Sequence, residues 1–401
     1  MFYTQMKLVI FTFLSLIFGS WIETTSYADI VPIYSNSRAN LTRLNSKQLK
    51  IKIQNLLEGD HVTLRNIGAI LQSGQKLLNQ RLEQEAEYRD EIITLYKTKD
   101  IHSPYRFIFD EPREISVLFT EDWAKYTHTD QMLELLSQGY SITFTDFANT
   151  ELGGGWDAGG NVQEEQMIQQ CPDFPLILSG SPTHDSEYYT RKYSGSIPKD
   201  DFEAHLALRG PSDDSADPIL LTNLRCLQEI KDEYSKDWMR IRKEPYSDLA
   251  EVLIPVPNSL PINVIAMAAP EVFFDFRGKS YTISLLNDLF NNAYTAFSMV
   301  QSHDKASTKK THLVTGRWGA GAFGHNVSMV IAIQYLAARL AGVNQLKFTG
   351  ISQQEGQPVI QFVDHLIKTT MEDSHGKIST EILLRNLLIN DFTASWKTRP
   401  L

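Results

Sequence analysis

The chain has 401 residues, of which 42% are hydrophobic and 21% are charged, a composition typical of a globular protein with one large or two ordinary domains. The formal net charge of −10 and the lack of any run of five Lys or Arg residues exclude a broad nucleic-acid-binding face. The two cysteines, Cys171 and Cys226, are too few for a disulfide framework, so one disulfide and two buried thiols are both compatible with the sequence.

The first 28 residues have the pattern of a secretory signal peptide. Lys7 precedes an apolar run from Leu8 to Ile22, and Ser26-Tyr27-Ala28 gives a small-x-small cleavage pattern. The alternative is an uncleaved membrane anchor, but the run is shorter than the ~20 residues that a membrane-spanning helix needs. We therefore expect a secreted or periplasmic protein that is free of the membrane after cleavage and meets its substrates outside its own cytoplasm, for example in another cell.

Residues 29–110 are predicted to form a helical accessory segment. Residues 29–45 are polar and aperiodic, whereas residues 46–97 carry apolar side chains at helical spacing, as at Ile67, Ile70 and Leu71. Gly59 and Gly74 are the expected breaks between two or three helices. The charged stretch 81–97 is expected to form a solvated helix face.

Residues 111–372 show the alternation of strands and helices that is typical of an α/β domain. The expected strands are 115–119, 141–147, 176–179, 219–221, 252–256, 262–268, 312–315 and 345–349. The expected helices are 129–136, 162–170, 227–238, 282–301, 327–340 and 360–371. Residues 185–216 are predicted to form a long loop, and residues 373–401 a C-terminal helical tail.

The most informative stretch lies between Ser141 and Cys171. Its strand leads to Asp146 and Asn149, and five glycines follow within eight residues: Gly153, Gly154, Gly155, Gly159 and Gly160. Such a loop allows the backbone to approach a ligand closely. Asn161 is a candidate cap for the next helix, whose first turn would hold Gln163, Glu164 and Glu165, where the helix dipole favours negative groups. We expect these carboxylates to line a cleft with a floor of glycines.

A second glycine loop, TGRWGAGAFG at residues 315–324, lies between an expected strand and an expected helix. Gly319-x-Gly321-x-x-Gly324 fits the dinucleotide fingerprint of Rossmann folds. That fold also places an acidic residue at the end of the next strand, but here the strand reads Leu346-Lys347-Phe348-Thr349-Gly350. A glycine loop followed by a helix N-terminus binds a pyrophosphate in either case, so both readings predict an ADP-containing ligand.

The triple glycine, its spacing to Gln163-Glu164-Glu165 and the preceding Asp146-Phe147-Ala148-Asn149 together resemble the signature of the poly(ADP-ribose) glycohydrolases. The loop at 315–324 is similar to the phosphate loop of the same family, and Ser186-Glu187-Tyr188 resembles its adenosine-contacting element. The resemblance covers roughly residues 140–195 and 260–350. It implies a macrodomain-like, three-layer α/β/α fold with a mixed sheet.

The resemblance also implies a function: hydrolysis of the glycosidic bond that joins ADP-ribose to a protein or to poly(ADP-ribose), with ADP-ribose as the product and no cofactor. In this family Glu165 would be the acid and base, while Glu164 and Asn149 would hold ribose hydroxyls. The other implied substrate-binding residues are Asp146, Gly153, Gly154, Gly155, Gln163, Tyr188, Arg317, Gly319, Gly321, Ala322, Phe323 and Gly324. A non-catalytic ADP-ribose-binding macrodomain and a Rossmann-type dinucleotide-binding protein are the alternatives.

Chemical reasoning supports unequal roles for the two glutamates. Glycosidases need a proton donor and a carboxylate or water on opposite sides of the bond, and adjacent helical residues diverge by roughly 100°. Arg317 stands where animal family members have Asn, and this added cation favours a grip on a single ADP-ribose. Simple packing is expected for Trp156 and Trp318, and His184 and His325 lack metal-ligand spacing, so no metal site is predicted.

Overall fold

A computed structural model describes most of the chain beyond the first 28 residues. The described residues are 29–98, 108–109, 112–149, 152–160, 162–179, 208, 217–235, 245–246, 248–270, 281–321, 323–373 and 378–389. The expected signal peptide therefore lies outside the described residues, as do His184 and Tyr188, the expected cap Asn161 and Ala322.

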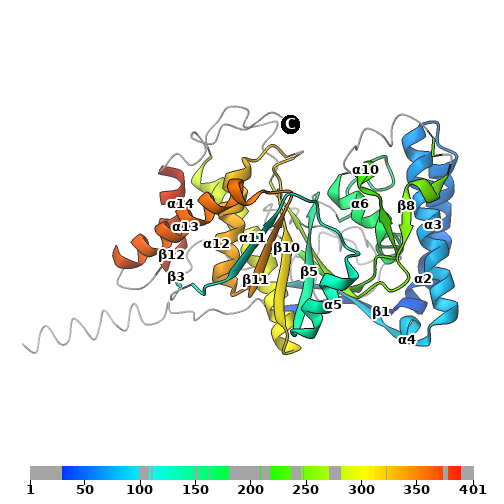
Figure 1. The fold of residues 1–401 in the computed structure, drawn as a ribbon, viewed down its shortest axis with the longest axis horizontal. Helices are drawn as coiled ribbons and strands as arrows, with labels where there is room; N and C mark the ends of the chain where they lie inside the picture. The colour runs from blue at the N-terminus through cyan, green and yellow to red at the C-terminus, as the bar shows by residue number, and fades with distance from the viewer. Residues whose placement is uncertain are drawn as a thin grey trace, which may run out of the picture.

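An eight-stranded mixed sheet forms the middle layer of the fold (Figure 1). Its spatial order is β1 (Ile30–Ser37), β2 (Ile92–Thr98), β6 (Ile219–Leu224), β9 (Ile262–Ala268), β5 (Tyr140–Ala148), β10 (Lys310–Thr315), β11 (Gln345–Thr349) and β4 (Ser116–Thr120). The five strands from β9 to β4 are parallel, whereas β1, β2 and β6 join the sheet by antiparallel pairing. β9 is buried along its whole length, as expected of a strand covered on both faces.

Four helices cover one face of the sheet. They are α11 (Ile283–Ala306), α12 (Val327–Ala341), α13 (Gln353–Asp373) and α14 (Thr380–Ile389). Their apolar side chains pack with Ile265, Met267, Leu313 and Leu346 of the sheet in one continuous core. The short pair β3 (Ile108–Phe109) and β12 (Ile378–Ser379) lies beside α13 and α14.

The other face carries α2 (Arg38–Leu57), α3 (Val62–Gln84), α4 (Ala86–Asp90), α5 (Thr129–Ser137), α6 (Gln163–Gln170) and α7 (Asp173–Leu178). Ile142, Phe144, Val264 and Ala266 bury their side chains against these helices in a second core. The hairpin of β7 (Gln228–Ile230) and β8 (Leu253–Pro255), the short helix α10 (Asp232–Ser235) and the 3₁₀ turn η2 (Leu249–Glu251) complete the described elements. The helices thus form two layers around the sheet, and the predicted three-layer α/β/α architecture is confirmed.

Several predicted elements are wrong. The expected strand 176–179 belongs to α7, because Phe174, Leu176 and Ile177 are buried by a helical turn. The expected helix 227–238 begins instead with β7, which pairs with β8, and only Asp232–Ser235 is helical in its described part. The break at Gly59 is confirmed. Gly74, however, lies within α3, where it permits a close approach: an added Cβ would lie 3.1 Å from Nε2 of Gln228.

The N-terminal segment is not helical throughout. Residues 29–45, expected to be aperiodic, include β1 and the start of α2, and the expected charged helix face at 81–97 includes β2. Both strands extend the central sheet at one edge. The burial of β2 does not alternate, because Thr94, Lys97 and Thr98 are buried as well as Ile93 and Leu95, so the strand lacks the period-two pattern of a half-buried strand.

The carboxyl ends of β5 and β10 are neighbours because the two strands pair in parallel from Lys310↔Tyr140 to Val314↔Phe144. The first glycine loop follows β5 and the second follows β10, so both loops lie at the same edge of the sheet. No described helix is both long enough and apolar enough to cross a membrane. Cys171 and Cys226, left open by the sequence, form a disulfide bond.

Candidate active site

Gln163 ties the start of α6 to the carboxyl end of β5. Its side-chain oxygen accepts a hydrogen bond from the Phe147 amide at 2.9 Å, and its side-chain nitrogen donates to the Thr145 carbonyl at 3.1 Å and to the Tyr126 hydroxyl at 2.9 Å. One side chain therefore satisfies backbone groups at the point where the strand leaves the sheet. The first turn of α6 is fixed above this edge.

Glu164 points back into the first glycine loop. Its Oε1 accepts a hydrogen bond from the Gly153 amide at 2.5 Å, and its Oε2 accepts one from the Asn149 amide at 3.3 Å. A Cβ at Gly154 would lie only 2.6 Å from Oε2, and the φ angle of +49° at this position further favours glycine. The loop can enclose the carboxylate because it lacks side chains here.

Glu165 binds a different part of the same loop. Its Oε1 accepts a hydrogen bond from the Gly155 amide at 3.2 Å, and its Oε2 accepts one from the Val162 amide at 2.8 Å at the start of the helix. Glu164 is 2% exposed and Glu165 is 5% exposed. The adjacent glutamates diverge into separate sets of amides, which supports the expectation of unequal roles.

Asp146 completes a cluster of three buried carboxyl groups. Its side chain is fully buried, and neither oxygen has a hydrogen-bond partner within the described residues. Burial raises the pKa of Asp146 well above its usual value, and the charge of Glu165 adds to this rise. Burial and the charge of Asp146 likewise raise the pKa of Glu164, although the Gly153 amide opposes the effect. Like charges in a buried cluster resist joint ionisation, so the protonated forms of Asp146 and Glu164 are favoured relative to those of solvent-exposed carboxyl groups.

The second glycine loop connects β10 to α12 and packs on the opposite core. The indole nitrogen of Trp318 donates to the Met267 carbonyl at 3.1 Å, and its ring is fully buried. Gly319 has a φ of +69°, and an added Cβ would lie 2.8 Å from Cβ of Ala269. A Cβ at Gly321 would meet no atom within 4 Å, so the loop is open at that position.

The loop ends at the N-terminus of α12. The Asn326 side chain accepts a hydrogen bond from the Met329 amide at 3.1 Å and caps this helix. The described part of the loop therefore leads into a capped helix N-terminus, the arrangement that binds phosphate groups in other folds. Phe323 lies beside it, partly buried against the α11–α14 core.

Arg317 is not a free cation. Its Nε donates to the Gly350 carbonyl at 2.7 Å, and its guanidinium forms an ion pair with Glu355 of α13 at 2.9 Å. This pairing reduces the positive charge that Arg317 could offer to a diphosphate. The expectation that this arginine favours a single ADP-ribose therefore loses its main physical argument.

Two aromatic residues near the ends of β5 and β11 were not predicted, because the β4–α5 connection carries no motif. Trp123 follows β4 and remains 48% exposed, and a Cβ added at Gly350 would lie 3.5 Å from its ring. Tyr126 is buried at the other end of this connection, where its ring contacts Phe144 edge-on. The connection between β4 and α5 thus runs from the end of β11 to the end of β5.

The remaining predicted residues that the structure describes are buried. Trp156 and Trp318 pack in the two cores, as expected. His325 is buried between the Tyr281 hydroxyl and the Pro270 carbonyl, and burial lowers its pKa to about 4, so it is neutral. Within the described part of the chain, no group of three His, Cys, Asp or Glu side chains is arranged to hold a metal ion.

The Rossmann reading has the required order of strand, glycine loop and helix, but not its acidic partner. The end of β11 carries Thr349, whose hydroxyl donates to the Thr315 carbonyl at 2.9 Å. The five parallel strands, extended by antiparallel strands at one edge and flanked by helices on both faces, define instead a mixed-sheet α/β protein of the macrodomain class.

A comparison with protein families agrees with this class. Residues 247–357 match the family described as poly(ADP-ribose) glycohydrolase (PARG), macro domain fold. The matched residues include β9, β10, the second glycine loop, α12 and β11. The match confirms the predicted resemblance to the poly(ADP-ribose) glycohydrolases over residues 247–357, which belong to the macro domain part of that family model.

Two solved structures are among those that resemble the chain. A poly(ADP-ribose) glycohydrolase from Thermomonospora curvata, bound to the inhibitor ADP-HPD, is 13% identical with a TM-score of 0.41, over 80% of this chain and 99% of that one. A poly(ADP-ribose) glycohydrolase from Deinococcus radiodurans in complex with ADP-ribose is 13% identical with a TM-score of 0.38, over 65% and 94% of the two chains. No protein with a curated description matches this sequence.

Proposed function

We propose that this protein is an ADP-ribosyl glycohydrolase, which cleaves the bond between ADP-ribose and its acceptor and releases ADP-ribose. One observation carries the proposal. The cluster of buried carboxyl groups lies at the end of β5, and the second glycine loop, with the N-terminus of α12, follows β10, which pairs with β5 in parallel. Paired strands lie about 4.8 Å apart, so one ligand can reach both sites. An acid–base centre beside a diphosphate-binding loop suits the glycosidic bond of ADP-ribose.

The carboxyl cluster would supply the acid and the electrostatic stabilisation. Cleavage passes through an oxocarbenium-like state, which needs a proton on the leaving group and a negative group near the anomeric carbon. We assign proton transfer to Glu165, with Glu164 and the Asn149 side chain holding ribose hydroxyls. Burial and the charge of Glu165 raise the pKa of Asp146, which favours its neutral form and limits the negative charge of the cluster.

The order of the strands also indicates how ADP-ribose would lie across the ends of the strands. With the distal ribose at the end of β5 and the diphosphate at the end of β10, the adenosine lies toward β11 and β4. Trp123, half exposed over Gly350, is the aromatic surface at that end. We therefore propose that Trp123 stacks on the adenine ring, as exposed aromatic side chains commonly do with bases.

We also propose that the protein is exported. The sequence of residues 1–28 supports this proposal, and so does the Cys171–Cys226 disulfide, because disulfides persist mainly in oxidising compartments. A secreted or periplasmic enzyme would meet ADP-ribosylated proteins or poly(ADP-ribose) outside its own cytoplasm. Immunoblotting of culture medium, periplasm and cells tests this: retention of the full-length chain in the cytoplasm would contradict it.

The function is tested by incubating the purified protein with poly(ADP-ribose) and with proteins that carry one ADP-ribose on Arg, Ser or Glu. We expect release of ADP-ribose from at least one of these substrates, and the substrate consumed fastest defines the specificity. Glu165→Gln should abolish release while calorimetry still detects ADP-ribose binding. Binding of ADP-ribose without release from any substrate would instead identify a reader of the modification.

A further inference from the structure

The helix that carries the glutamates ends at the disulfide. α6 has eight residues, with Glu164 and Glu165 in its first turn, and Cys171 follows its last residue. At 1.5 Å per residue, Glu165 and Cys171 are about 9 Å apart along the helix axis. A short helix transmits a displacement of one end to the other, because its backbone hydrogen bonds leave few soft torsions.

The segment that follows Cys226 clamps the last turn of α6. The Leu227 amide donates to the Gln170 carbonyl at 3.1 Å, and the Gln228 side chain donates to the Gln169 carbonyl at 2.7 Å. These carbonyl groups are at the helix C-terminus, where no intrahelical amide can reach them. The disulfide joins this segment covalently to the end of α6, because Cys226 immediately precedes Leu227 and Cys171 immediately follows α6. Both cysteines are buried.

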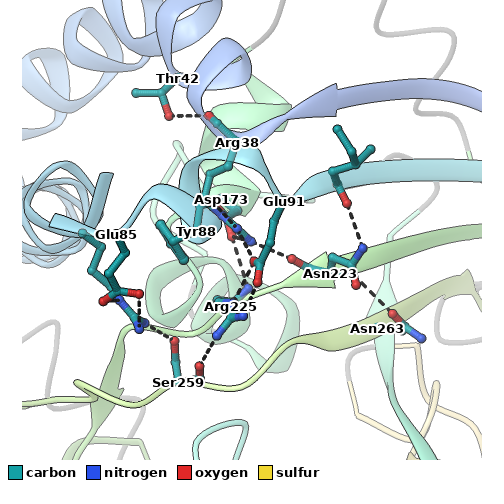
Figure 2. Close-up of polar contacts among 12 residues, drawn as sticks. Arg38, Thr42, Glu85, Tyr88, Glu91, Asp173, Asn223, Arg225, Ser259 and Asn263 are labelled. Atoms are coloured by element: carbon teal, nitrogen blue, oxygen red, sulfur yellow. Dashed lines mark hydrogen bonds and ion pairs between the residues drawn. The ribbon is translucent and has the colours of Figure 1, made fainter. Parts of the chain in front are cut away.

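A charged cluster holds the chain segments that adjoin Cys171 and Cys226, and Figure 2 shows its polar contacts. The Arg38 guanidinium binds both oxygens of Asp173 at 2.9 and 3.1 Å, and the Arg225 amide donates to the same carboxylate at 3.2 Å. Glu91 bridges Arg38 and Arg225, and the Arg38 guanidinium lies 4.1 Å from the centre of the Tyr88 ring. Asp173 follows Cys171 by two residues and Arg225 precedes Cys226, so the cluster fixes the backbone beside both cysteines.

We infer that Cys171 and Cys226 are positioning residues for the catalytic glutamates, so that hydrolysis depends on the oxidised state of this disulfide. When the bond is intact, the clamp and the charged cluster fix the C-terminal end of α6, and the first turn holds Glu164 and Glu165 against the glycine loop. A dithiol breaks the S–S bond by supplying two electrons and two protons, which yields two thiols and an oxidised dithiol. A thiol–disulfide oxidant, such as a protein disulfide or glutathione disulfide, reverses the reaction.

The two halves of the site would respond differently. The glycine loop after β10 packs against the core of α11–α14, whereas α6 packs against the core of α2, α3 and α7 on the other face. Reduction should therefore disturb the glutamates and leave the diphosphate loop in place. A general loss of structure would disturb both.

The inference rests on the proposed function, and the experiment separates the two. The chain has no other cysteine, so a dithiol acts only on this bond, and thiol titration confirms complete reduction. We expect kcat to fall on the order of tenfold or more on reduction, as for a displaced catalytic group. Because the loop after β10 packs in the α11–α14 core and α6 packs in the other, the dissociation constant for ADP-ribose should change much less than kcat. Reoxidation should restore kcat.

Two variants control for stability. Cys226→Ala should reproduce the reduced enzyme and should not respond to the dithiol. Leu384→Ala, which removes a buried side chain from α14 in the opposite core, lowers the melting temperature without touching α6. It should keep its kcat at temperatures where it is folded, even if it melts as early as Cys226→Ala.

Hydrogen exchange gives a readout that needs no turnover. The amides of Gly153, Gly155 and Val162 bond the two carboxylates and should exchange faster after reduction, while amides of β10 should not. If the oxidised protein releases no ADP-ribose but these amides still respond, the proposed function fails and the positioning role stands. The inference is overturned if reduction leaves kcat and these amides unchanged, or if ADP-ribose affinity is lost together with kcat.

Discussion

The substitution Gly160→Ala tests the placement of Glu165 with a single added methyl group. An ideal Cβ at Gly160 would lie 2.8 Å from Cδ of Glu165 and closer still to Oε1, whereas ordinary contacts begin at 3.4 Å. The backbone at Gly160 does not require glycine, since its φ lies outside the left-handed region. The protein can therefore accept the methyl group only by moving the carboxylate, by roughly 0.6 Å or more, which exceeds the ~0.5 Å tolerance of catalytic groups.

This displacement gives the expected magnitude. A misplacement of about 1 Å can cost a factor of 10², so Gly160→Ala should lower kcat by roughly 10- to 100-fold. In free energy the loss is about 1.4–2.7 kcal/mol of transition-state stabilisation. The melting temperature should change little, because the flexible end of a side chain yields at low cost.

The assay is release of ADP-ribose under saturating substrate, with Gly155→Ala as the matched variant. A Cβ at Gly155 would lie 3.6 Å from the same Oε1 atom, which is an ordinary contact, and its amide would still donate to Glu165. Gly155→Ala should therefore lose far less activity than Gly160→Ala. Equal kcat values for Gly160→Ala and the wild type, in a folded protein, would refute the catalytic placement of Glu165.

Three further predictions follow from the buried groups and the exposed tryptophan. Because the pKa of Asp146 is raised in the folded state, Asp146 stabilises the fold below its unfolded pKa and loses this contribution as pH rises through its folded pKa. Asp146→Asn should therefore be more stable than wild type at pH 8, by about 1–3 kcal/mol in urea unfolding. Equal stability of the two proteins at pH 8 would contradict the burial argument. Trp123→Ala should weaken ADP-ribose binding by about 5- to 100-fold in calorimetry, as expected for a lost stacking surface, whereas Trp123→Phe should retain most of the affinity; no change with Ala would remove Trp123 from the site. Arg38→Met leaves the Asp173 charge buried without its main partner and should cost about 3–5 kcal/mol of unfolding free energy, and a double variant with Asp173→Leu should recover part of this loss.

The clustering of the carboxyl groups was predictable from the sequence because its signals are local. Strand β5, the glycine loop and the first turn of α6 are contiguous, so their spacing alone brings Asp146, Glu164 and Glu165 together. The second glycine loop was found for the same reason. Parallel pairing of β5 with β10 joins the two loops, and the alternation of strands and helices made this pairing predictable.

The errors arise where distant partners determine the local structure. Residues 92–98 form a strand because β1 and β6 pair with them, although their charged surroundings favoured a solvated helix. Residues 176–177 are apolar enough for a strand, but a short helix against α2 buries them. The contacts of Arg317 with Glu355 and Gly350, and of Trp123 with Gly350, join residues far apart in the chain, and no spacing rule predicts them.

A crystal structure of Glu165→Gln with ADP-ribose tests the central claim most directly. We expect the distal ribose to lie in the first glycine loop, with its C1″ hydroxyl within hydrogen-bond reach of residue 165, at about 2.6–3.2 Å. The diphosphate should lie over Gly321 at the N-terminus of α12, with the adenine beside Trp123. A reversed ligand, with adenine at Asp146 and the distal ribose at Trp123, or a ligand away from both loops, would contradict the account.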